Sequence, residues 1–197
     1  MGDSRKITSF KRRLTSIVAV ATVALGVVVS APAPDARATP SVARPVFFVP
    51  LGEFPRTEAA ALASFVNREL GVRTGVLSGS PIPKTALNRQ RKQLVAEDLI
   101  DVVAARRTTA TNGPVLIGLT VEDMHTRAIP NWRFSFSIRH PSGLAVVSSA
   151  RMDPRFLGLF PDPALRMRRL QKMVMKNVGT LSLGLAESRN PRSACST

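Results

Sequence analysis

Two acidic residues and a histidine stand close together in the middle of the chain and could hold a divalent metal ion. Glu122, Asp123 and His125 follow directly after an apolar run that ends at Thr120. Carboxylate oxygens and an imidazole nitrogen bind divalent cations, and the same groups exchange protons in acid–base catalysis. The competing interpretation is a structural turn in which the Asp123 carboxylate accepts hydrogen bonds from backbone N–H groups. The turn is our first expectation, and the metal site or acid–base set is the alternative.

A second set of candidates lies on a predicted helix near the C-terminal end, where basic side chains could bind an anion. Lys172 and Lys176 are four residues apart and therefore share one helical face, which extends to Thr180. With Arg169 nearby, this face could hold a peptide carboxylate, a phosphate or an acidic glycan. The competing interpretation is a solvated basic face on which Asn177 bonds to the neighbouring backbone.

Other catalytic arrangements lack the residues they need. The chain has two histidines, His125 and His140, and one cysteine, Cys195, so it can form neither a three-histidine metal site nor an internal disulfide. Ser148 and Ser149 lack the Gly-x-Ser-x-Gly elbow of a serine hydrolase. No aromatic RNA-binding motif or zinc-finger spacing occurs, so nothing specific indicates nucleic acid.

Composition and the N-terminal sequence predict an exported, basic protein. A net charge of +15 attracts anionic surfaces or ligands, and a hydrophobic fraction of 44% supports a packed core. A basic start, an apolar stretch over Leu14–Ser30 and the A-x-A site Ala36-Arg37-Ala38 are typical of a signal peptide. The apolar stretch also approaches the length of an uncleaved anchor. We expect a signal peptide at 1–38, a flexible leader at 39–44 and a secreted or membrane-anchored domain at 45–197.

The elements that must position the candidate residues alternate between strands and helices. The hydrophobic pattern predicts strands at 45–51, 72–77, 115–120, 132–139 and 144–152, and helices at 57–70, at 85–106 and from Pro163 onward. The run 115–120 shows no polar alternation, which is typical of a central strand covered on both faces. The run 132–139 alternates aromatic or apolar with polar residues, which is typical of a half-buried strand. The order predicts a single α/β domain with one mixed sheet packed with helices. Glu58, Glu97 and Asp98 are expected on solvent-facing helix surfaces.

Three successive segments, VLIGLTVEDMH, IPNWRFSFSIR and GLAVVSSARM, resemble the archaemetzincins, which are zinc-dependent proteases of the zincin type. In that family a strand ends in a short acidic turn, an aromatic strand follows, and the next strand closes in Val-Ser-x-x-Arg. The following helix carries His-Glu-x-x-His-x-x-Gly-x-x-His-Cys. The resemblance spans about Pro45 to the C-terminus and implies a metzincin-like fold, with RRLQKMVMKNVGTLSLGLAESRNPRSAC in the place of the zinc helix.

The same resemblance implies that the zinc-binding residues are replaced. The three zinc histidines fall on Lys176, Thr180 and Ala186, the general-base glutamate falls on Asn177, and Gly184 stands one place late for the family's glycine. An ammonium group repels a dication, and a carboxamide takes up no proton near neutral pH. We therefore predict no catalytic residue, no metal ligand and no bound cofactor, although the family implies zinc.

The first functional hypothesis is thus an exported, non-catalytic pseudo-peptidase or peptide-binding domain, with an extended peptide lying along the 132–151 hairpin. One alternative is an active hydrolase of zincin descent that uses other residues, such as Glu122, Asp123 and His125. The other alternative is a basic, anion-binding protein of the cell envelope.

Overall fold

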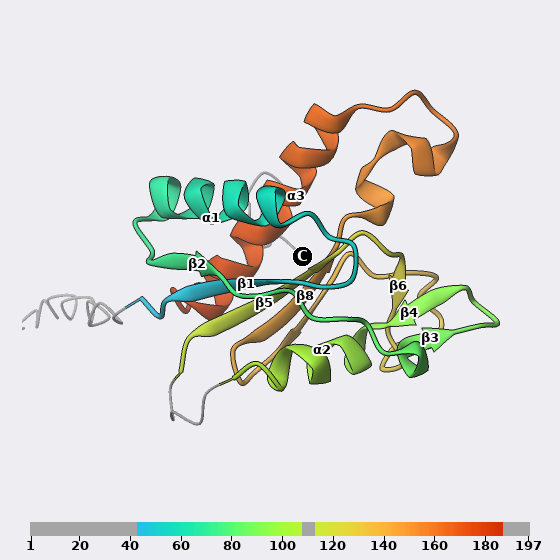
Figure 1. The fold of residues 1–197 in the computed structure, drawn as a ribbon, viewed down its shortest axis with the longest axis horizontal. Helices are drawn as coiled ribbons and strands as arrows, with labels where there is room; N and C mark the ends of the chain where they lie inside the picture. The colour runs from blue at the N-terminus through green and yellow to red at the C-terminus, as the bar shows by residue number, and fades with distance from the viewer. Residues whose placement is uncertain (1–42, 108–112, 187–197) are drawn as a thin grey trace, which may run out of the picture. The chain divides into compact units, whose positions relative to one another are not determined.

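The computed structural model describes residues 43–107 and 113–186, which contain a mixed five-stranded sheet (Figure 1). Its strands are β1 (Val46–Pro50), β2 (Thr74–Val76), β5 (Val115–Thr120), β7 (Ser137–His140) and β8 (Leu144–Ser148), in the order β2-β1-β5-β8-β7. Strands β2, β1, β5 and β8 run parallel to one another, and β7 pairs antiparallel with β8 at the edge of the sheet. The predicted signal peptide at 1–38 and most of the predicted leader lie outside the described residues.

Helices cover both faces of this sheet. Helices α1 (Arg56–Leu70) and α3 (Pro163–Leu181) lie on one face, and α2 (Ala96–Ala104) lies on the other (Figure 1). Each strand serves both layers because successive side chains point to opposite faces: Val46 and Phe48 pack toward α1 and α3, while Val49 packs toward α2. In the described part of the chain, no helix has both the length and the apolar character needed to cross a membrane.

Several sequence predictions are confirmed by this arrangement. Strand β5 is buried along its whole length, because it lies in the middle of the sheet and is covered on both faces. The turn at 141–143 joins β7 to β8 as a hairpin, with the Gly143 N–H donating to the His140 carbonyl at 3.0 Å. Helix α3 begins at Pro163, and the Asp162 carboxylate caps it by accepting from the Leu165 N–H at 2.8 Å.

The prediction of one long helix at 85–106 is wrong for the first half of that segment. That segment forms a 3-10 turn, η1 (Lys84–Ala86), and the strands β3 (Leu87–Asn88) and β4 (Gln93–Val95), before α2 begins at Ala96. The Asn88 side chain accepts from the Arg91 N–H at 3.1 Å and stabilises a turn, a local bond that competes with helix formation. Strand β4 then pairs with β6 (Met124–His125), a partner some 30 residues away. A helical pattern among neighbouring residues gives no information about such a remote strand pairing.

The predicted strand at 132–139 is also shorter than its alternating pattern suggested. Regular pairing covers only β7, and Trp132 is 52% exposed although the pattern placed it inside. The inward residue is Ser135, whose N–H donates to the Met124 carbonyl at 2.8 Å and whose hydroxyl donates to the Ser137 carbonyl at 3.1 Å. These bonds anchor Ser135 and turn the aromatic side chain of Phe136 outward.

The close packing between β5 and its neighbours predicts a large effect of Gly118→Ala. A Cβ atom at Gly118 would lie 2.6 Å from Val103 Cγ2 and 2.9 Å from Leu51 Cδ1, so the core must shift. We expect the free energy of unfolding, measured in urea, to fall by about 1–3 kcal/mol. Gly79→Ala is the matched control, because its Cβ would meet Pro50 O at an ordinary 3.5 Å. Equal stability of the two variants would contradict the packing described here.

Candidate functional site

Helix α3 carries the positions that the family resemblance assigns to zinc chemistry. The helix is held against the sheet by Leu170, Val174 and Val178, which are fully buried beside α1 and form an apolar stripe at helical spacing. This packing orients the neighbouring face of the helix toward the edge strand β7. The contact is direct, because the Ser137 hydroxyl donates to Asn177 Oδ1 at 3.1 Å.

Asn177, at the place of the family's general base, is completely buried and is hydrogen-bonded at both ends of its amide. Its relative exposure is 0%, and its Nδ2 donates to the Met173 carbonyl at 2.7 Å. Its oxygen receives the bond from Ser137. A buried amide with donor and acceptor both satisfied is a structural link between helix and strand. This agrees with the sequence interpretation in which Asn177 bonds to the neighbouring backbone.

The other three positions that the resemblance assigns to zinc ligands offer no better chemistry. The Thr180 hydroxyl donates to the Lys176 carbonyl at 3.1 Å, one turn back in the same helix. The hydroxyl proton is therefore already used in a hydrogen bond within the helix. Lys176 is half-buried. Ala186 is exposed and lies beyond the end of α3, after a turn at Gly184 that has a φ of 66°.

The donor set at these positions does not fit a catalytic zinc ion. Such a site requires about three nitrogen, oxygen or sulfur ligands from the protein. Here the chain supplies an amine, a hydroxyl bonded to its own helix, a buried amide and a methyl group. Across residues 43–107 and 113–186, no group of three or more His, Cys, Asp or Glu side chains is arranged to hold a metal ion.

The basic face predicted on α3 is only partly available to a ligand. Arg169 donates from Nη1 to the Met152 carbonyl at 3.0 Å and so ties α3 to the turn η2 (Ala150–Met152). Lys172 is exposed and Lys176 is half-buried. Anion binding by Arg169, Lys172 and Lys176 therefore stays a prediction.

The structure does not arrange Glu122, Asp123 and His125 as a metal site. Arg151 donates to both carboxylate oxygens of Asp123, at 2.8 and 2.7 Å, and Gln93 Nε2 donates to the same group at 2.7 Å. The Asp123 carboxylate thus forms a partly buried ion pair, and the expectation that it caps backbone N–H groups is wrong. His125 is buried, with its ring nitrogens 3.3 Å from Asn88 Nδ2 and from the Thr126 carbonyl.

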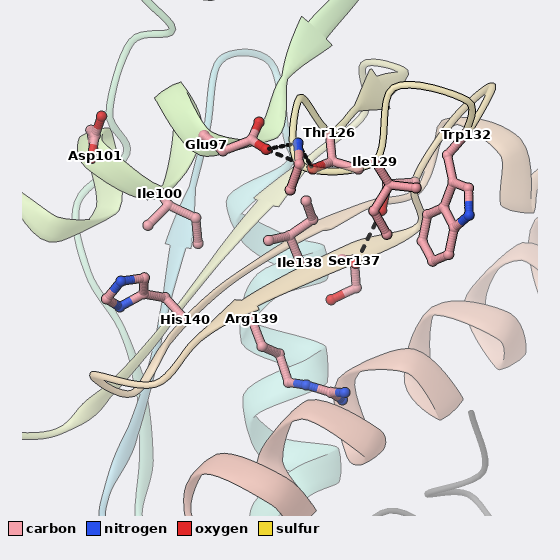
Figure 2. Close-up of a pocket in the computed structure, with 12 residues that line it drawn as sticks. Glu97, Ile100, Asp101, Thr126, Ile129, Trp132, Ser137, Ile138, Arg139 and His140 are labelled. Atoms are coloured by element: carbon pink, nitrogen blue, oxygen red, sulfur yellow. Dashed lines mark hydrogen bonds between the residues drawn. The ribbon is translucent and has the colours of Figure 1, made fainter.

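A groove of about 430 Å³ lies beside β7 on the side that faces α2 (Figure 2). Ile100 of α2 and Ile138 of β7 face each other across it, with Trp132 and His140 at opposite ends. The remaining lining residues are Glu97, Asp101, Thr126, Ala128, Ile129, Ser135, Ser137 and Arg139. The groove is therefore mostly apolar and runs along an edge strand.

One wall of the groove is organised by Glu97, which was expected to face solvent. Its Oε1 accepts from the Thr126 hydroxyl at 2.6 Å and from the N–H groups of Arg127 and Ala128 at 2.8 and 3.1 Å. Burial acts to raise the pKa of Glu97, but these hydrogen bonds to the charged form outweigh it and lower the pKa. Glu58, also expected in solvent, forms an ion pair with Arg166 instead.

Sequence reasoning missed this groove because its walls come from three separated segments. Glu97 and Ile100 lie on α2, Ile129 and Trp132 lie in the loop after β6, and Ile138 lies on β7. The residues joined by the Glu97 hydrogen bonds are about 30 positions apart. No local pattern of residue types signals such a contact.

Comparison with known proteins gives consistent results. No family model matches the chain. The archaemetzincin of Pyrococcus abyssi is 26% identical over 153 residues, which covers 75% of this chain and 79% of that protein. The crystal structure of the archaemetzincin of Methanopyrus kandleri matches with a TM-score of 0.60 and 26% identity, over 78% of this chain and 81% of that one. The zinc-dependent peptidase of Methanocorpusculum labreanum matches in fold, with a TM-score of 0.61 and 16% identity over 77% and 87% of the two chains.

The lowered pKa of Glu97 predicts a pH-dependent contribution to stability. A carboxylate with a depressed folded-state pKa stabilises the fold above its ordinary value of 4.5, and this contribution is lost as the pH falls through the folded-state value. Glu97→Gln should therefore lower the free energy of unfolding by about 1 kcal/mol near neutral pH, a figure reduced for partial solvation. The difference between variant and wild type, measured in urea, should shrink below the folded-state pKa. A difference that does not change with pH would rule out the charged hydrogen bonds.

Proposed function

The chain belongs to an archaemetzincin-like family, and from that premise we propose that it is a non-catalytic member which binds an extended peptide. The peptide lies against β7 and the groove beside it. The protein holds its ligand without cleaving it, because the positions of the zinc ligands and the general base carry side chains that cannot perform those roles.

The buried amide of Asn177 is the observation that supports the loss of catalysis. A general base must reach a water molecule or a substrate proton, and it must take up that proton. Asn177 is fully buried, it is bonded to Ser137 and Met173, and its amide has no useful basicity. Helix and strand are thus joined at the place where hydrolysis would require an open, charged carboxylate.

The topology of the sheet supports peptide binding. Strand β7 is an edge strand, and on its outer side no further strand of the five-stranded sheet follows in the described part of the chain. An extended peptide adds to such an edge by backbone hydrogen bonds, and neighbouring pockets receive alternate side chains. The groove lined by Ile100, Ile129 and Ile138 offers a pocket for an apolar side chain. The peptide-binding edge is therefore β7 itself, which is shorter than the hairpin expected from the sequence.

The hydrolase alternative finds no comparable support. The Asp123 carboxylate is occupied by Arg151 and Gln93, and His125 is buried, so neither can approach a substrate without breaking these contacts.

Metal analysis tests the loss of catalysis. We expect purified full-length protein to contain far less than one zinc ion per chain and to cleave no member of a random peptide library. Lys176→His/Thr180→His is the positive control, because two histidines four residues apart on one helical face chelate zinc. That variant should retain more zinc than the wild type. One tightly held zinc ion per wild-type chain, or peptide cleavage sensitive to a chelator, would overturn the proposal.

Peptide selection tests the binding site. A peptide selected from a random library of short synthetic peptides should bind the full-length protein in a calorimetric titration. Ile129→Ala should weaken that binding on the order of tenfold, because an apolar contact in the groove is lost. Leu87→Ala is the matched control, since Leu87 is exposed to a similar extent, 46% against 41%, and lies outside the groove. Equal affinities of the two variants, or a library without any binding peptide, would contradict the site.

A further inference from the structure

The loop formed by the end of η3 (Pro154–Leu157) and the residues that lead to α3 exposes large apolar side chains to solvent. The exposed fractions are 45% for Phe156, 69% for Leu157, 61% for Leu159 and 94% for Phe160. Four such residues within five positions concentrate exposed apolar surface in one short segment, which soluble proteins rarely leave uncovered without a binding role. Figure 1 shows this segment at the upper right, between the short turns that follow β8 and the start of α3.

The chain fixes the shape of this loop at both ends. At its start, Asp153 Oδ1 accepts from the Arg155 N–H at 2.9 Å. Gly158 then turns the chain with a φ of 74°, and its N–H donates to the Arg155 carbonyl at 2.9 Å. At its end, Asp162 caps α3. The apolar side chains are therefore presented by an ordered turn.

Basic residues flank the loop in the sequence, and the two acidic residues of this segment are already engaged. The segment 151–172 contains six basic residues, namely Arg151, Arg155, Arg166, Arg168, Arg169 and Lys172, against two acidic residues. Asp153 pairs with Arg155, and the side chain of Asp162 caps α3. Because Arg151, Arg155 and Arg166 are themselves ion-paired, the cationic border of the loop consists of Arg168, Arg169 and Lys172.

A cationic pocket of about 460 Å³ adjoins the loop through Phe156. It is lined by Arg91, Lys92, Gln93, Asp123, Arg133, Arg151 and Phe156. The Arg151 guanidinium lies between two aromatic rings, 4.1 Å from the centroid of Phe134 and 4.3 Å from that of Phe156, and is held by Asp123. Its orientation is therefore preorganised, and it neutralises the one carboxylate of the pocket.

Two cations of this pocket remain for a ligand. The side chains of Lys92 and Arg133 form no ion pair with any described residue. Lys92 also has a φ of 54°, the single positive value at a described residue other than glycine. Such backbone conformations are uncommon and cluster at sites of function.

We propose that this face binds an anionic lipid surface. Leu157, Leu159 and Phe160 enter the boundary between headgroups and acyl chains, and a lipid phosphate occupies the pocket between Lys92 and Arg133. Apolar contact together with cationic attraction is the combination that holds proteins at such surfaces. A second copy of this chain is a poor occupant, because both partners would bring the same excess of positive charge.

A tryptophan introduced into the loop reports its location directly. Trp132 is the single tryptophan of the chain, so the full-length variant Trp132→Phe/Phe160→Trp carries its only indole at position 160. With vesicles of phosphatidylglycerol and phosphatidylcholine in equal parts, its emission should shift to the blue and be quenched by brominated acyl chains. With phosphatidylcholine alone, neither change should occur. Because the probe sits in the loop, attachment through another segment would not produce this signal.

Charge variants test the pocket. Arg133→Gln should weaken binding to the mixed vesicles about fivefold, the usual effect of one cation close to an anionic membrane. Arg73→Gln removes a charge that is also exposed but lies outside the pocket, and it should have a clearly smaller effect.

Three results would overturn the proposal. The first is an indole emission of the Trp132→Phe/Phe160→Trp variant that is already blue-shifted without vesicles, because the loop would then be covered by protein. The second is an indole of that variant that stays unquenched on anionic vesicles. The third is an equal loss of vesicle binding in the variants Arg133→Gln and Arg73→Gln.

Discussion

The burial of one face of α3 against the sheet is the constraint on which the site depends. Leu170, Val174 and Val178 fill the layer shared with α1, and burying each such side chain stabilises the fold by about 1.5–3 kcal/mol. Once these residues are inside, the helix cannot rotate without exposing them. Asn177 must then face β7, where its amide completes a hydrogen-bonded link to Ser137.

This link matters because the resemblance to archaemetzincins places a charged glutamate at the position of Asn177. A carboxylate in the same buried position would be strongly disfavoured unless a cation or a metal compensated for its charge. A neutral amide needs no such compensation and is satisfied by one hydroxyl and one carbonyl. A neutral residue at this position thus allows a closed, stable junction between helix and strand. The strand that it contacts, β7, is the edge of the sheet at which we propose that a peptide binds.

A shortage of acidic residues shapes the rest of the molecule. The chain has 13 acidic residues against 28 lysines and arginines, and several acids hold distant segments together. Asp123 joins the end of β5 to Arg151, Glu58 joins α1 to Arg166, and Glu97 orders the loop after β6. Because these acids are used internally, the surface that remains is cationic. The groove beside β7 and the cationic pocket next to the apolar loop are lined by different residues.

Local signals in the amino-acid sequence were sufficient to predict the strands β1, β5 and β8 and the start of α3. These signals rest on the hydrophobic pattern and on Pro163. The donor types at the positions that the family resemblance assigns to zinc could also be judged from the sequence, because they follow from residue identity alone. The conformation of 87–95 could not, since pairing with β6 and a buried Gln93 overrode a helical pattern. The roles of Asp123 and Glu97 and the placement of the groove likewise emerged only in the folded chain, because each depends on residues about 30 positions apart meeting in space.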